Sequence, residues 1–243
     1  WWVVSGRCGV PRPFWLAAHT LWTDVARDIY LISTCPLKTP SSVICYHATL
    51  FFYRLSGDMA STRIKICGIT NKEDARAAIS CGADAIGLVF YANSPRAVAI
   101  NQAAQIAAIV PPFVSVVGLF VDEPAASIER ILSSVAIDLI QFHGDETPQF
   151  CQQFKHPWIK ALRVKPGLDL SGACHTYGAA RGVLLDSWQD GIPGGTGKTF
   201  DWQLALGELP LPVVLAGGLH DGNVGHAIAT LHPAAVDVSG GVE

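Results

Sequence analysis

Short apolar runs alternate with alanine-rich amphipathic stretches from residue 63 to the end of the chain. Runs such as "AIGLVF", "VSVVGLF", "GVLLD" and "PVVLAGG" are almost entirely apolar, with no regular alternation of polar residues. Strands of this composition are typical of a parallel sheet that is covered on both faces. Each run begins roughly 20–30 residues after the previous one, which is the repeat of a βα unit. This period favours an α/β fold.

The pattern predicts eight strands, over 63–66, 84–90, 113–119, 137–141, 158–163, 181–185, 212–215 and 234–238. It predicts seven helices, over 71–81, 101–109, 124–134, 146–154, 170–177, 201–206 and 221–230. Asn71 and Asp201 stand where helix N-caps are expected. Eight strands with seven intervening helices favour a (β/α)8 TIM barrel that lacks the final helix.

Residues 1–58 differ in style from the rest of the chain. They hold four of the seven tryptophans, and prolines at 11, 13, 36 and 40 interrupt their apolar runs. No stretch among them has the period of an amphipathic helix of about ten residues. We therefore expect an extension over 1–58 that is not part of the working protein, and a barrel domain over 59–243. Deletion of the extension is expected to leave stability and activity unchanged.

The composition excludes several classes of protein. The net charge is -3 and basic residues form no cluster, which argues against nucleic-acid binding. The seven cysteines are irregularly spaced with no CxxC pair, so neither a disulfide framework nor a structural zinc site is indicated. Free thiols are typical of the cytoplasm. The apolar runs fall short of the roughly 18 residues that a membrane span needs.

Polar and glycine-rich segments follow the predicted strands, at the face that carries the active site in a TIM barrel. In chain order they are "CGIT", "YANSPR", "FVDEP", "QFHGDE", "ALRV", "DSWQDGIPGGTGK", "AGGL" and "DVSGG".

These segments, in this order, resemble the phosphoribosylanthranilate isomerase family of tryptophan biosynthesis. The matching pieces within 63–243 are "KICGIT", "GADAIGLVF", "SPR", "GLFVD", "QFHGDE", "LLDS", "GGTGKTFDW", "AGGL" and "VDVSGGVE". Members of the family begin a few residues before "KICGIT", so Met59, the one methionine of the chain, is the expected start. Members continue past the last motif with a final helix, and here we expect that helix to be missing.

The resemblance implies the isomerisation of N-(5-phosphoribosyl)anthranilate to 1-(2-carboxyphenylamino)-1-deoxyribulose 5-phosphate, the third step of tryptophan synthesis from chorismate. This Amadori rearrangement needs a general acid, a general base and a phosphate site, and no metal or other cofactor. The resemblance also implies a small phosphorylated substrate, no nucleic-acid or membrane partner, and a cytoplasmic monomer or homodimer. Association with neighbouring enzymes of the pathway is left as an option.

Two residues are the expected catalysts by this resemblance. Cys67 is the expected general base, because a thiol holds some thiolate at neutral pH and nearby positive dipoles raise that fraction. Asp186 is the expected general acid, because it ends an apolar run and a carboxyl partly removed from water holds its proton more readily. The alternatives are a buried structural cysteine and an aspartate that only caps a turn. Cys81, beside Gly82 at a predicted helix end, is interpreted as packing.

Glycines after the last three strands are the expected phosphate site. Glycine lets backbone N–H groups approach an anion closely, and TIM barrels often bind phosphate after strands 7 and 8. The predicted residues are Gly194, Gly195, Gly197, Gly217, Gly218, Gly240 and Gly241. Gly240 stands where the family usually carries serine, a change that keeps the backbone donors.

Four further residues are expected to bind the rest of the substrate. Arg96 resembles the residue that lies near the anthranilate carboxylate, which a guanidinium grips with two hydrogen bonds. Gln141 and His143 are expected to face the barrel mouth by alternation along their strand. His143 either tunes the thiolate, binds substrate or is structural. Asp237 is expected to contact the bridging nitrogen.

Two other functions stay open at this point. A sister barrel of histidine biosynthesis carries out the same rearrangement on another substrate, but a carboxylate is expected there where Cys67 stands. The second alternative is an inactive barrel fragment, and the presence of both Cys67 and Asp186 counts against it.

Overall fold

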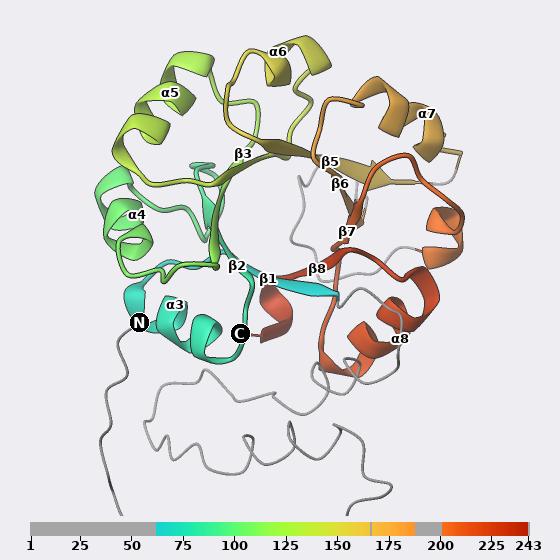
Figure 1. Cartoon of the computed structure of the whole chain (residues 1–243), viewed down its shortest axis with the longest axis horizontal. Helices are drawn as coiled ribbons and strands as arrows, with labels where there is room; N and C mark the ends of the chain where they lie inside the picture. Colours follow the sequence, from blue (N-terminus) through green and yellow to red (C-terminus); the bar gives the residue numbers. More distant parts are fainter. Residues whose placement is uncertain (1–61, 166, 188–200, 243) are drawn as a thin grey trace, which may run out of the picture. The chain divides into compact units, whose positions relative to one another are not determined.

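The computed structural model describes residues 62–165, 167–187 and 201–242. Within them strands and helices alternate along the chain, and the helices lie in a ring outside the strands (Figure 1). The order is β1 (Arg63–Cys67), α3 (Lys72–Ser80), β2 (Ala85–Val89), α4 (Ile100–Ala107), β3 (Ser115–Phe120), α5 (Ala125–Ser134), β4 (Leu139–Phe142), α6 (Pro148–Gln152), β5 (Trp158–Val164), α7 (Leu170–Thr176), β6 (Val183–Ser187), the 3-10 helix η2 (Trp202–Ala205), β7 (Val213–Leu215), α8 (Asp221–Leu231), β8 (Ala235–Val238) and the 3-10 helix η3 (Gly240–Val242).

The strands form a closed parallel barrel in chain order. Each strand pairs with the next, and β8 closes the ring against β1, with Lys65 opposite Asp237. On the other side of β1, Cys67 lies opposite Gly87 of β2. The predicted (β/α)8 TIM barrel is confirmed, and every predicted strand is present with ends that agree within two residues.

The helix predictions hold with one difference in extent and one in helix type. The helix α6 is shorter than the predicted 146–154, because Thr147 caps it by accepting from the Phe150 N–H and Pro148 fixes its first turn. The segment predicted as a helix over 201–206 is the 3-10 helix η2, which Asp201 caps. Asn71 caps α3 as predicted. Gly82 follows α3 with a φ of 88°, in the left-handed region.

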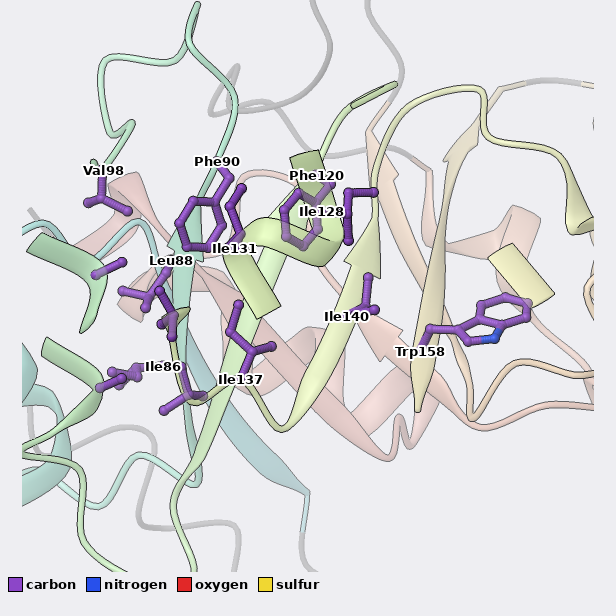
Figure 2. Close-up of a cluster of buried hydrophobic side chains, with 14 of the residues drawn as sticks. Ile86, Leu88, Phe90, Val98, Phe120, Ile128, Ile131, Ile137, Ile140 and Trp158 are labelled. Atoms are coloured by element: carbon purple, nitrogen blue, oxygen red, sulfur yellow. The ribbon is translucent and has the colours of Figure 1, made fainter. Parts of the chain in front are cut away.

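Apolar side chains fill both faces of the barrel wall. Alternate residues of β2, β3 and β4 point outward and pack under α4 and α5, as Ile86, Phe120 and Ile140 do in Figure 2. The residues between them point into the barrel, where Ile159, Leu184 and their neighbours form a smaller buried cluster. The strands therefore read as continuous apolar runs because both of their faces are buried.

The predicted extension over 1–58 lies outside the described residues, so the division of the chain at residue 58 stays a prediction. Among the residues that are described, no helix has the length and apolar character that crossing a membrane requires.

Candidate active site

A cavity of about 640 Å³ opens at the carboxyl ends of the strands. Every predicted site residue that the structure describes lines it: Cys67, Arg96, Gln141, His143, Asp186, Gly217, Gly218, Asp237, Gly240 and Gly241. They come from β1, the β2–α4 loop, β4 and the residue that follows it, β6, β8, and the segments after β7 and β8. The barrel topology thus brings together residues that are up to about 170 positions apart, as parallel strands with aligned carboxyl ends must.

Cys67 ends β1 and lies partly exposed in the cavity. The facing strand leaves room for its sulfur, since a Cβ built on Gly87 would lie 2.7 Å from Cys67 Sγ. Gly68 follows with a φ of 89°, a conformation that side chains other than glycine rarely adopt. This turn ends the strand directly after the thiol and keeps it at the rim of the barrel.

Although Cys67 is partly exposed to the cavity, the protein around its thiol removes solvent from it and so acts against the thiolate form. Desolvation raises the pKa of this thiol above its usual value, and the Lys65 ammonium, within hydrogen-bonding reach of the sulfur, offsets only part of the rise. The sequence led us to expect positive dipoles beside Cys67. The structure has a full positive charge there instead, together with a desolvation effect that outweighs it.

Lys65 itself is buried two residues before Cys67, on the same side of β1. Its Nζ lies 2.8 Å from Asp237 Oδ2 of β8. Burial pushes the pKa of Lys65 down, but Asp237 and Cys67 push it up by more. Burial also raises the pKa of Asp237, and Lys65 opposes that rise.

Gln141, His143 and Asp186 form a chain of buried hydrogen bonds across the cavity wall. Gln141 Nε2 lies 2.9 Å from His143 Nδ1, and His143 Nε2 lies 3.1 Å from Asp186 Oδ2. Because Gln141 donates to Nδ1 in this arrangement, Nε2 carries the ring proton and points it at the carboxyl group. His143 therefore contacts the expected acid, which the sequence did not predict.

The other oxygen of Asp186 is also fixed. Its Oδ1 accepts from the Ser187 backbone N–H at 2.8 Å. The Gly217 backbone packs against the same carboxyl, since a Cβ there would lie 3.1 Å from Asp186 Oδ1 and 2.7 Å from Ser187 N. The carboxyl is thus held in one orientation, with an edge on the cavity.

Arg96 lies between the loops that follow β1 and β8. A Cβ on Gly68 would collide with Arg96 Cδ, and one on Gly240 would lie 3.3 Å from Arg96 Nη2. The two glycines therefore create the slot in which this half-buried side chain lies. Its guanidinium reaches the cavity beside the expected phosphate loops.

The loops after β7 and β8 meet at one side of the cavity. Gly217 and Gly218 have φ values of 83° and 64°, and their N–H groups donate to no backbone acceptor in the described part of the chain. Gly241 packs directly on the backbone of Leu219, with no space for a side chain. This arrangement leaves backbone donors for an anion. The predicted phosphate glycines Gly194, Gly195 and Gly197 lie outside the described residues.

Sequence reasoning missed Lys65 and Ser239, which belong to two of the motifs already singled out. Ser239 lines the cavity between Asp237 and Gly240. Lys65 precedes Cys67 by two residues, so strand alternation alone places both on one face. The feature that could have identified Lys65 from the sequence was a charged residue at an inward position of a buried strand.

A family model described as N-(5'-phosphoribosyl)anthranilate isomerase matches residues 64–243. The chain belongs to the N-(5'-phosphoribosyl)anthranilate isomerase family. This result decides against the sister barrel of histidine biosynthesis, the first alternative that the sequence left open.

Relatives with this name cover most of the barrel. The isomerase of Pseudomonas putida (strain W619) is 60% identical over 185 residues, which are 76% of this chain and 90% of that protein. The isomerase of Alcanivorax borkumensis is 58% identical over 185 residues, 76% of this chain and 85% of that protein.

Solved structures of the family agree with the fold. The phosphoribosylanthranilate isomerase of Thermotoga maritima is 40% identical, with a TM-score of 0.68, and the match covers 75% of this chain and 89% of that one. A second structure, in complex with reduced 1-(o-carboxyphenylamino)-1-deoxyribulose 5-phosphate, is 39% identical, with a TM-score of 0.65 and the same two coverages.

Proposed function

We propose that this chain isomerises N-(5'-phosphoribosyl)anthranilate to 1-(2-carboxyphenylamino)-1-deoxyribulose 5-phosphate, within tryptophan synthesis. One observation carries the proposal beyond family membership: a thiol, a carboxyl and a set of glycine turns face the same cavity. A relative binds a reduced form of the expected product. The thiol, the carboxyl and the glycine turns are a base, an acid and a phosphate site, the three groups that an Amadori rearrangement of a phosphorylated sugar requires.

In the first step, Asp186 gives a proton to the furanose ring oxygen. The bond from C1 to that oxygen breaks, and the nitrogen lone pair forms a C=N bond, which leaves an open-chain iminium ion. The hydrogen bonds from Ser187 N and His143 Nε2 fix the Asp186 carboxyl while it loses the proton. The same two donors stabilise the carboxylate that results.

In the second step, the Cys67 thiolate removes the proton from C2. The electron pair of that C–H bond forms the C1=C2 bond of an enolamine, and the iminium nitrogen becomes neutral. C1 then gains a proton while the C2 hydroxyl loses one, which gives the ketone. Cys67 and Asp186 come from β1 and β6, on different parts of the cavity wall, so they can act on different atoms of one substrate.

The remaining groups hold the substrate or orient the catalytic acid. We assign the phosphate to the backbone donors of Gly217, Gly218, Gly240 and Gly241, together with Gly194, Gly195 and Gly197, which lie outside the described residues. Arg96 binds the anthranilate carboxylate. Gln141 and His143 act chiefly by orienting Asp186, and Asp237 accepts a hydrogen bond from the bridging nitrogen.

Two substitutions test the proposal. Cys67→Ala and Asp186→Asn are each expected to lower kcat by at least roughly 100-fold, the usual scale for a general acid or base. The Michaelis constant should change little, since neither group holds the phosphate. Cys81→Ala, which removes a thiol at the end of α3, is the matched control and should keep normal turnover. Near-full activity in Cys67→Ala would refute its assignment as the base.

We further propose a cytoplasmic location, because a biosynthetic enzyme of this kind acts on metabolites there and the chain carries several free thiols. For the oligomeric state we propose a monomer or a homodimer. The isomerase of Thermotoga maritima is dimeric, and one solved structure is of monomers generated from it.

A further inference from the structure

Lys65 is a charged residue at an interior position of the barrel. It points inward from β1, and its side chain is only 6% exposed. Other interior positions of the barrel are apolar, with Ile159, Ala161 and Leu184 in one buried cluster. Burying an ammonium carries a large desolvation cost unless it is paired. A charge kept at such a position therefore calls for an explanation beyond packing.

Asp237, the partner of Lys65, uses only one of its two carboxylate oxygens in hydrogen bonds within the described residues. Asp237 Oδ2 lies 2.8 Å from Lys65 Nζ, but Asp237 Oδ1 is buried and has no hydrogen-bond partner among the described residues. Asp237 lines the cavity, as Cys67 does. Lys65 thus lies beside one cavity group, Asp237 of β8, and two residues before another, Cys67 of its own strand.

We propose that Lys65 is a positioning residue of the isomerase reaction, whose ammonium anchors Asp237 in the cavity wall and favours the thiolate form of Cys67. The inference rests on the proposed function only for the role of Cys67 as the base. The electrostatic coupling itself exists with or without substrate.

Other charges around the cavity could act on the thiol as well. The titratable groups that line it with Cys67 are Tyr91, Arg96, His143, Asp186, His220 and Asp237. The largest effect on the thiol is burial, which raises the pKa of Cys67. Lys65 lowers that pKa more than Asp237 raises it. We therefore expect removal of Lys65 alone to raise the pKa of Cys67, and removal of both partners to raise it by less.

The test measures the thiol in the full chain without substrate. The rate of Cys67 alkylation by iodoacetamide is followed against pH, with the modified peptide identified by mass spectrometry. In Lys65→Met the midpoint is expected to rise by about one pH unit, so that alkylation below the midpoint slows roughly tenfold. The double variant Lys65→Met, Asp237→Asn carries no buried charge at this site and should show a smaller rise.

Lys160→Met is the matched control. Lys160 is buried to a similar degree and pairs with a buried carboxylate, Glu146 Oε2, at 3.0 Å, but it lies on β5 and faces away from the thiol. Its loss should lower stability and leave the Cys67 midpoint in place. A midpoint that does not rise in either Lys65 variant, or that rises equally in Lys160→Met, would overturn the proposal. If Lys65→Met does not fold, the test is whether the midpoint of Cys67 alkylation rises in the double variant.

Failure of this inference and failure of the proposed function are separable. Alkylation needs no substrate, whereas the isomerase assay on the unmodified chain reports the function alone. An inactive chain with the expected midpoints would refute the function and keep the electrostatic role of Lys65.

Discussion

At the scale of single residues, the reactivity of Cys67 is set by its neighbours. Gly87 gives the sulfur its space, burial holds the proton on the thiol, and Lys65 counters that burial. A thiol that is mostly protonated can still act as a base, because only the thiolate fraction needs to react and that fraction depends on pH.

The rise in the pKa of Cys67 predicts the pH dependence of the reaction. In the proposed mechanism the active form of Cys67 is the thiolate, and its fraction grows about tenfold per pH unit until the pH passes the pKa of the thiol. Since burial raises that pKa, kcat/KM should still be increasing above neutral pH. Steady-state assays between roughly pH 6.5 and 9.5 would measure this. A profile that is flat or falls over this range would contradict Cys67 as the base.

Arg96 is expected to act in binding. Removing a charged hydrogen-bond pair costs about 1.5–3 kcal/mol, so Arg96→Ala should raise the Michaelis constant by roughly 10- to 150-fold with a smaller effect on kcat. The control is Arg76→Ala, because Arg76 is an exposed residue of α3 whose partner, Glu73, is also exposed. A loss of turnover with an unchanged Michaelis constant would exclude the binding role.

At the scale of elements, the sequence was informative where one physical rule dominated. Strands buried on both faces read as apolar runs, and Asn71 and Asp201 cap as their side chains allow. The start of α6 was not predictable, because Glu146 lies outside the helix and accepts from Lys160 Nζ and from the Asp122 N–H. Both partners come from other strands and loops.

In the candidate site too, features set by local sequence were predictable, and contacts between distant segments were not. Cys67 and Asp186 could be named from motifs at strand ends, as could the glycine turns. The contact between His143 and Asp186 could not, because it joins β4 to β6 across β5 and depends on the curvature of the barrel. Lys65 was accessible to sequence reasoning, since alternation along one strand is sufficient to place it.

Strand β2 supplies a prediction of its own. Gly87→Ala would put a methyl group 2.7 Å from Cys67 Sγ and 3.0 Å from Cys67 Cα, so the thiol must move. We expect a large loss of kcat and a fall of about 1–3 kcal/mol in the free energy of unfolding, as overpacking costs. Gly178→Ala is the control, because its Cβ meets only the His175 carbonyl oxygen. Normal turnover in Gly87→Ala would show that the position of the thiol is not critical.

At the scale of the whole molecule, two buried lysine–carboxylate pairs lie on opposite faces of the barrel wall and have different roles. The pair of Lys65 and Asp237 lies inside the barrel and touches the cavity. Lys160 lies on the outer side of β5, where it contacts Glu146 and the carbonyl oxygen of Gly144 and holds the loop after β4. The inner pair serves the chemistry in our proposal, and the outer pair fixes the loop that follows His143.

Buried thiols predict that the barrel loses stability in alkaline solution. Burial raises the pKa of Cys151 in α6 to about 12 and raises the pKa of Cys174 in α7 as well. In the unfolded chain these thiols lose their protons from about pH 9 upward, while the folded chain keeps them. The folded state then binds more protons, so the free energy of unfolding must fall as pH rises.

The contribution of Cys151 to the fall in the free energy of unfolding with rising pH can be measured separately. Between roughly pH 9.5 and 11, Cys151→Ala should lose stability less steeply than the unmodified chain, by about 1 kcal/mol per pH unit, because one titrating thiol has been removed. Below about pH 8 the two curves should run parallel, with the variant lower by the cost of the small cavity, which provides the internal control. Urea unfolding at a series of pH values would measure both. Parallel curves throughout the alkaline range would show that Cys151 titrates in the folded chain as it does in the unfolded one.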